Sequence, residues 1–220
     1  NYRDQWSKRI SGYGSYYYNH QSTNEGENSY ETNNTTLINN NQDLNSLTKG
    51  NNHRFTFNLE YQIDSFNYLK VSPSVNYSGS DANSNTVFDY KNQSDGVKTQ
   101  DGSNMNFNNS QAPNFAATIL YNHKFRKRGR NFSSSITLGT NQNNSEQDVT
   151  NLNTVYQPFF FRRNTFQFTD QENNNYNYGV RFTYSEPINK YRSLDFSFSH
   201  NLNYGRNDRK TYNVDSATKV

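Results

Sequence analysis

Residues 54–63, R-F-T-F-N-L-E-Y-Q-I, decide the fold of this chain. Apolar and aromatic residues occupy every second position in this stretch, and polar residues occupy the positions between them. Because successive side chains of a β-strand point to opposite faces, the pattern predicts a strand with one apolar and one polar face. Such a strand suits a sheet that separates hydrocarbon from water.

The same alternation recurs along the chain and predicts about seven long strands. The connections between these segments alternate in length. Short turns are predicted at residues 64–67, 127–129 and 187–190, and long polar loops at residues 21–52, 79–106 and 142–174. Short periplasmic turns on one rim and long extracellular loops on the other are typical of outer-membrane barrels.

The composition conflicts with a soluble globular fold. Only 30% of the 220 residues are hydrophobic, the mean hydropathy is -1.19, and yet 16% of the residues are aromatic. Disordered chains are poor in aromatic residues, whereas a membrane barrel needs no central core and keeps its lumen and loops polar. We therefore predict an all-β, antiparallel up-and-down transmembrane β-barrel segment.

Aromatic residues bracket the predicted turns and loops. Rings with a polar tip favour the headgroup level of a bilayer, so these residues predict two girdles, although they are also ordinary strand formers. The girdle beside the short turns comprises Tyr61, Tyr68, Tyr121, Phe125, Phe132, Tyr184 and Tyr191. The girdle beside the long loops comprises Tyr16, Tyr18, Tyr77, Tyr176 and Tyr204.

Few features of the sequence indicate chemistry. The net charge of +3 is scattered, which argues against nucleic acid as a partner, and the chain has no cysteine for disulfides or thiolate chemistry. Residues 81–85, D-A-N-S-N, begin like a calcium loop but lack its later Gly and Glu, so we predict a solvated loop there. We predict no enzyme activity and no catalytic, cofactor-binding or metal-binding residue.

Three groups of residues are candidates for contact with ligand, lipid or partner. The basic run at residues 126–130 predicts a solvated turn, with lipid headgroups as the alternative contact. Strand parity predicts a set of charged residues that face the lumen: Arg54, Glu60, Lys70, Lys124, Arg181 and Asp195. The third group, a candidate ligand or partner loop, comprises Phe159, Phe160, Phe161, Arg162 and Arg163.

The third group combines three aromatic rings with two positive charges. Three successive phenylalanines cannot all point to one strand face, so some pack within the loop or contact a ligand or partner. The two arginines could then hold an anionic group. Packing within the loop, or a strand that continues beyond the membrane, is the alternative.

The chain resembles the outer-membrane β-barrel family of Bacteroidetes that is related to TonB-dependent receptors. Residues 1–6, N-Y-R-D-Q-W, residues 13–20, Y-G-S-Y-Y-Y-N-H, and the hairpin at residues 52–77 carry this resemblance. It implies a parent protein with a signal peptide, a small carboxypeptidase-regulatory-like β-domain, a plug and a barrel of about 22 strands. Residues 1–220 would then be a fragment from the middle of one barrel domain, without signal peptide, plug and remaining strands.

The resemblance implies uptake of a nutrient or chelate across the outer membrane of a Gram-negative cell. Its implied partners are outer-membrane lipid, the rest of the barrel, the plug, and a TonB-type energy-coupling protein that acts through the plug; no cofactor is expected. The alternatives are a barrel that serves as an adhesin, assembly factor or passive pore, and a secreted Asn-rich β-protein. A second sheet would cover the aromatic face of the secreted protein.

Overall fold

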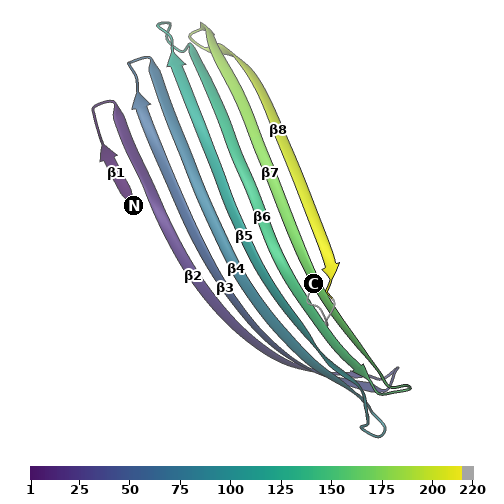
Figure 1. The fold of residues 1–220 in the computed structure, drawn as a ribbon. Coiled ribbons are helices and arrows are strands. Elements are labelled where there is room, and N and C mark those ends of the chain that lie inside the picture. The colour runs from purple at the N-terminus through teal and green to yellow at the C-terminus, as the bar shows by residue number, and fades with distance from the viewer. Residues whose placement is uncertain (215–220) are drawn as a thin grey trace.

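The computed structural model describes residues 1–214 as a single antiparallel sheet whose strands pair in chain order (Figure 1). The all-β, up-and-down architecture predicted from the sequence is confirmed. The sheet has eight strands rather than about seven, and it is open, with β1 and β8 at its two edges. The strands are β1 (Tyr2–Gln5), β2 (Ile10–Asn33), β3 (Ile38–Gln62), β4 (Asn67–Asn92), β5 (Lys98–Lys124), β6 (Asn131–Val155), β7 (Phe161–Asn189) and β8 (Arg192–Asn213).

The additional strand lies at the start of the chain. β1 has four residues and pairs with residues 11–14 of β2, which is too short a segment to show an alternating pattern. Trp6 lies in the turn between β1 and β2. Its ring packs over Gly12, where an added Cβ would lie 3.2 Å from the ring, and it stacks on Phe57 with the ring centroids 6.3 Å apart.

The prediction of three long polar loops is wrong. Those segments continue the strands as hairpins and end in turns at residues 34–37, 93–97 and 156–160, which we call the far rim. The turns at residues 6–9, 63–66, 125–130 and 190–191 form the opposite, near rim (Figure 1). Asn33 closes one far-rim turn by accepting hydrogen bonds from the backbone N–H groups of Thr35 and Thr36, both at 3.0 Å.

The error in the loop prediction has a physical cause. Both faces of these hairpins are polar, so the sequence lacks the period of two that marks a half-apolar strand, and Asn is a poor strand former. Backbone pairing nevertheless runs without a register shift from Ile10 opposite Tyr61 to Asn33 opposite Ile38. At about 3.3 Å per residue, strands of 22 to 29 residues are far longer than the roughly 9–11 residues that cross a bilayer.

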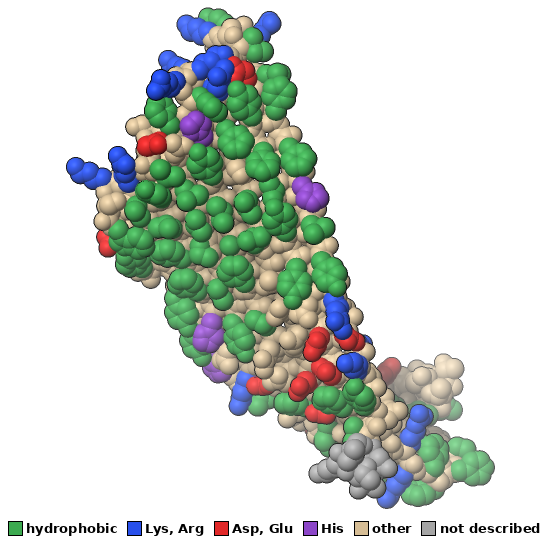
Figure 2. Space-filling view, turned by 45° about the horizontal axis from the view of Figure 1, so that its top comes forward, with side chains coloured by type: hydrophobic (Ala, Val, Ile, Leu, Met, Phe, Trp, Pro, Cys, Tyr) green, Lys and Arg blue, Asp and Glu red, His purple; other side chains and the backbone are tan. Residues whose placement is uncertain are grey.

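The register brings the apolar residues of neighbouring strands onto one face. Leu59 pairs with Val71, and the same cross-strand row continues through Ile119, Ile136 and Val180. Parallel rows on either side hold the aromatic residues of β3, β7 and β8. Figure 2 shows the resulting band of hydrophobic side chains across the middle of this face, with basic side chains gathered at its top. We call this side of the sheet the apolar face and the opposite side the polar face.

No hydrophobic side chain among residues 1–214 is buried. Phe55, Phe196 and Phe198 are 45%, 58% and 61% exposed, although each lies in the apolar band. Fully burying one such side chain is worth roughly 1.5 to 3 kcal/mol. A face of this size requires a covering medium or partner, because a contiguous apolar surface in water promotes aggregation.

A charge placed on each face tests this assignment. Leu59→Arg should destabilise the protein in a bilayer by about 2 to 4 kcal/mol, because it puts an arginine in the middle of the apolar band. Asn58→Arg, on the polar face one residue away, should be nearly neutral. The measurement is the free energy of unfolding by urea of the full-length protein in lipid vesicles. Equal losses in the two variants would contradict the assignment of the faces.

Candidate functional site

The six residues predicted to face the lumen all lie on the polar face. Three of them share one cross-strand row, in which Glu60 pairs with Lys70 and the row continues through Leu120 and Ser135 to Arg181. Lys124 and Asp195 share a second row, close to the near-rim turns. Arg54 lies between its cross-strand neighbours Tyr17 and Asn76. The alternation of side chains along each strand thus predicts which residues share a face.

Glu60 and Lys70 belong to a network that also includes Tyr13. Lys70 Nζ donates a hydrogen bond to the Tyr13 hydroxyl at 2.9 Å, and the hydroxyl donates to Glu60 Oε1 at 3.2 Å. Lys70 Nζ also lies 3.4 Å from Glu60 Oε1 and 5.5 Å from the centre of the Tyr13 ring. The charges of Glu60 and Lys70 therefore offset one another, and the phenol fixes their relative position.

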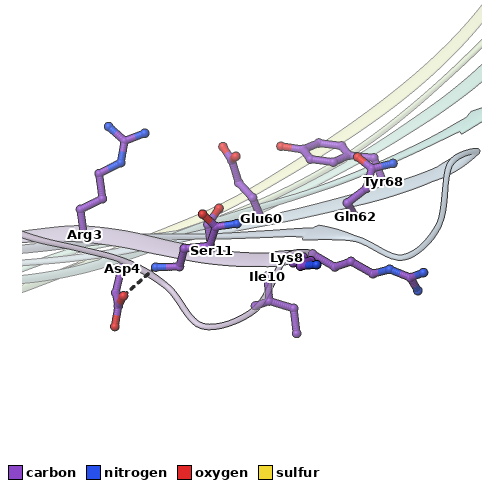
Figure 3. Close-up of a pocket in the computed structure, with 10 residues that line it drawn as sticks. Arg3, Asp4, Lys8, Ile10, Ser11, Glu60, Gln62 and Tyr68 are labelled. Atoms are coloured by element: carbon purple, nitrogen blue, oxygen red, sulfur yellow. Dashed lines mark hydrogen bonds between the residues drawn. The ribbon is translucent and has the colours of Figure 1, made fainter.

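A hollow of about 510 Å³ lies beside this network, at the edge formed by β1 and β2. Figure 3 shows Arg3, Glu60 and Tyr68 projecting from one side of the sheet, and Asp4 and Ile10 from the other. The hollow therefore combines a guanidinium, a carboxylate and a phenol on the polar face. These groups can donate and accept hydrogen bonds to a polar ligand, and they include no pair arranged for nucleophilic catalysis.

The polar face changes character beyond this charged zone. A row of four asparagines, Asn76, Asn114, Asn141 and Asn175, crosses β4 to β7 next to Arg54. From there to the far rim, the polar-face residues of β3, β4, β5 and β6 include no charged side chain and consist mainly of Asn, Gln, Ser and Thr. This wall can hydrogen bond to a ligand but attracts neither sign of charge.

The candidate ligand or partner loop forms a far-rim turn. Phe159, Phe160 and Phe161 are 79%, 62% and 51% exposed, and a cis peptide bond precedes Pro158. The Tyr156 ring lies 6.0 Å from the Phe160 ring, and its hydroxyl donates to Asp101 at 3.2 Å. The turn thus has partial internal packing, and its three phenylalanine rings remain accessible.

The two arginines after these phenylalanines cannot act as a pair. Arg162 pairs with Thr154 and Arg163 with Asn153, so the two side chains leave opposite faces of β7. The Arg162 guanidinium lies 5.7 Å from the centre of the Phe160 ring, on the side that continues the apolar face. Arg163 is the one that belongs to the polar face.

Sequence reasoning missed the tyrosines on the polar face. Tyr68 was predicted for the near-rim girdle, but it pairs with Gln62 and so lies on the same face as Glu60 and Lys70. Tyr13 also faces this side, opposite Asn58 and Arg3. Each of these tyrosines occupies a position at which the alternation along the strand predicts a polar-face residue. That position is the signal that could have identified both.

A carboxylate clamp lies at the near rim, around Glu186 of β7. Arg130 donates to both oxygens of Glu186, at 2.6 and 2.8 Å, and Tyr184 donates to Oε2 at 2.7 Å. Lys127 Nζ approaches Oε1 at 2.5 Å. Hydrogen bonds from Arg130, Lys127 and Tyr184 hold the pKa of the Glu186 carboxyl well below its ordinary value. The clamp ties the β5–β6 turn to the end of β7.

No model of a known protein family matches this chain, and no curated protein matches it. Within residues 1–214, no three His, Cys, Asp or Glu side chains are grouped so as to hold a metal ion. The same residues contain no helix with the length and apolarity needed to span a membrane. The predicted calcium-loop-like segment, residues 81–85, lies inside β4 rather than in a loop.

The Glu186 clamp predicts a pH dependence of stability. Because the folded pKa lies below the ordinary value of about 4.5, the clamp stabilises the fold above that pH, and its contribution is lost as the pH falls towards the folded pKa. Glu186→Gln should therefore flatten the dependence of the urea midpoint on pH between about pH 6 and pH 3. Ser193→Ala, which removes a near-rim polar side chain that does not titrate, should keep the wild-type slope. Equal slopes for wild type and Glu186→Gln would contradict the role of the clamp.

Proposed function

We propose that this chain is part of an outer-membrane β-barrel of the TonB-dependent-receptor type, which imports a nutrient or chelate into a Gram-negative cell. The observation that carries the proposal is the apolar band, which is continuous in register from β2 to β8 and uncovered. Lipid would cover this band, and the opposite polar face would line an aqueous lumen.

The height of the band supports a membrane location. On β3 it extends from His53 to Tyr61, about nine residues, which is within the roughly 9–11 residues of a transmembrane strand. At its far side, Tyr18, His53 and Tyr77 form an aromatic row with ring centroids 4.7 and 6.2 Å apart. Aromatic rings with polar tips favour the level of the headgroups.

The open edges support a larger barrel. β8 is exposed along almost its whole length, and within residues 1–214 the outer side of β2 has no neighbour beyond its pairing with the four residues of β1. Unpaired backbone groups are costly in hydrocarbon, so a membrane location requires further strands at both edges. A complete barrel would supply them and could also hold a plug.

Import would use the two ends of the polar face differently. The exposed far-rim turn, with Phe161 and Arg163 on the polar face, would capture the ligand, and the uncharged amide wall would conduct it towards the charged zone around Glu60 and Lys70. Energy would come from an inner-membrane partner through the plug. This scheme uses no cofactor and no enzymatic step.

A surface adhesin or assembly factor is the second candidate. The observation that favours it is the length of the hairpins, which extend well beyond the apolar band and carry the exposed Phe159 and Phe160 at one tip. An exposed aromatic cluster on a protruding hairpin suits contact with a macromolecule. Such a barrel would need neither plug nor energy coupling.

The membrane location can be tested on the full-length protein. We expect it to sediment with the outer membrane, to resist extraction by alkaline carbonate and to float with lipid in a density gradient, because its apolar band requires hydrocarbon. An outer-membrane lipoprotein and a secreted protein of the same cell serve as controls. Recovery in the soluble fraction, without lipid, would favour the secreted alternative.

The far-rim turn can be tested by uptake. Phe161→Ala with Arg163→Ala should weaken uptake of the limiting nutrient or chelate severalfold, because both residues lie on the polar face at the far rim and would contact the ligand, while surface abundance stays unchanged. The nutrient is identified first as the one on which a deletion strain fails to grow. Phe107→Ala with Arg206→Ala removes one ring and one cation from the other face and should leave uptake intact. Unchanged uptake in the first variant at equal abundance would exclude this turn from ligand capture.

A further inference from the structure

A groove of about 790 Å³ lies at the near rim between the β5–β6 turn and the β7–β8 turn. Basic side chains line it from both turns: Lys127, Arg128, Lys190 and Arg192. Ile188 and Tyr191, which are 63% and 87% exposed, supply an apolar wall and a phenol. We call this feature the basic groove.

The positive charge of the basic groove is not balanced by the residues around it. Within residues 125–130 and 186–193 the acidic residue is Glu186, near the end of β7, and Arg130, Lys127 and Tyr184 already occupy its oxygens. Within residues 1–214, no carboxylate lies within ion-pair distance of Arg128, Lys190 or Arg192. The groove therefore presents several cations to an external group, and it complements an anion.

The groove adjoins the end of the apolar band. Arg192 has the same strand parity as Leu194 and Phe196, so it continues the apolar face towards the near rim. Leu194 pairs with Glu186, which places the clamp between the band and the groove. A molecule with an anionic headgroup and long apolar chains would match the basic groove and the adjoining apolar band.

We propose that the basic groove binds the phosphate of an anionic phospholipid whose acyl chains lie on the adjoining apolar face. The inference rests on the proposed membrane location. Basic side chains near a membrane surface attract anionic headgroups, whereas Tyr191 and Ile188 suit the boundary between headgroups and hydrocarbon. The bound lipid would cover the basic groove between the β5–β6 turn and the β7–β8 turn.

The test uses the full-length protein reconstituted in vesicles with trace spin-labelled lipids. The motionally restricted component of the spectrum gives the relative association of phosphatidylglycerol and phosphatidylcholine with the protein. We expect the wild type to prefer phosphatidylglycerol. Lys190→Ala with Arg192→Ala should lower this preference by roughly fivefold for each charge removed. The conservative pair Lys190→Arg with Arg192→Lys should retain it.

A matched control removes two positive charges from the opposite end of β8. Arg206→Ala with Lys210→Ala should leave the preference unchanged, since these exposed residues lie in the far extension. Equal association of the two lipids with the wild type, or an equal loss in the control variant, would overturn the groove as a lipid site. Loss of the preference when inorganic phosphate replaces chloride at equal ionic strength would assign it to free phosphate instead. Absence of a restricted component for both lipids would overturn the membrane location itself.

Discussion

The structure depends on one antiparallel ladder of backbone hydrogen bonds that keeps its register over most of the length of strands of 22 to 29 residues, with register shifts after Tyr90 and after Pro187. A sheet without buried hydrophobic side chains has no core that could fix the relative position of its strands. The ladder fixes it instead, and since side chains alternate with period two, it also assigns every residue to a face. A slip of one residue in β3 would move Phe55 and Leu59 to the polar face and Glu60 to the apolar one.

The two faces of the sheet carry different kinds of side chain along the same strands. Near the near rim, the apolar face carries rows of aliphatic and aromatic residues, while the polar face carries the Tyr13–Glu60–Lys70 network. Beyond the Tyr18–His53–Tyr77 row, both faces are polar and only the ladder continues. The change falls within individual strands rather than at their ends. The fold therefore continues through two environments without a break in secondary structure.

Alternation was a reliable guide wherever one face is apolar. Residues 54–63 and the other amphipathic segments were placed on strands, and the faces of Arg54, Glu60 and Arg181 follow from parity alone. The sequence did not predict the polar hairpins as strands, because hydropathy shows no period of two where both faces of a strand carry polar residues. The contact of Glu186 with the β5–β6 turn depends on the register between β6 and β7, which the sequence does not reveal. The same register places Arg162 and Arg163 on opposite faces of β7, and their role in ligand contact stays a prediction.

The distribution of charge limits where a ligand could travel along the extended hairpins. The continuation of the apolar face carries charges of both signs, with Asp148, Asp170 and Glu172 on β6 and β7 and Lys210 opposite Asp170, so a charged ligand would meet both attraction and repulsion there. The polar face of β3 to β6 has no charge over the same height, and its amides can exchange hydrogen bonds with water for hydrogen bonds with a ligand. Weak contacts with uncharged groups, repeated along the wall, would let a ligand pass along it rather than hold the ligand in one place. Along β3 to β7 the charged contacts lie at the two ends, at Arg163 and at the Glu60–Lys70 pair, while the flanking β2 adds Glu25, Glu27 and Glu31 to the same face. This arrangement would suit the proposed passage of a ligand along the wall rather than a single binding pocket.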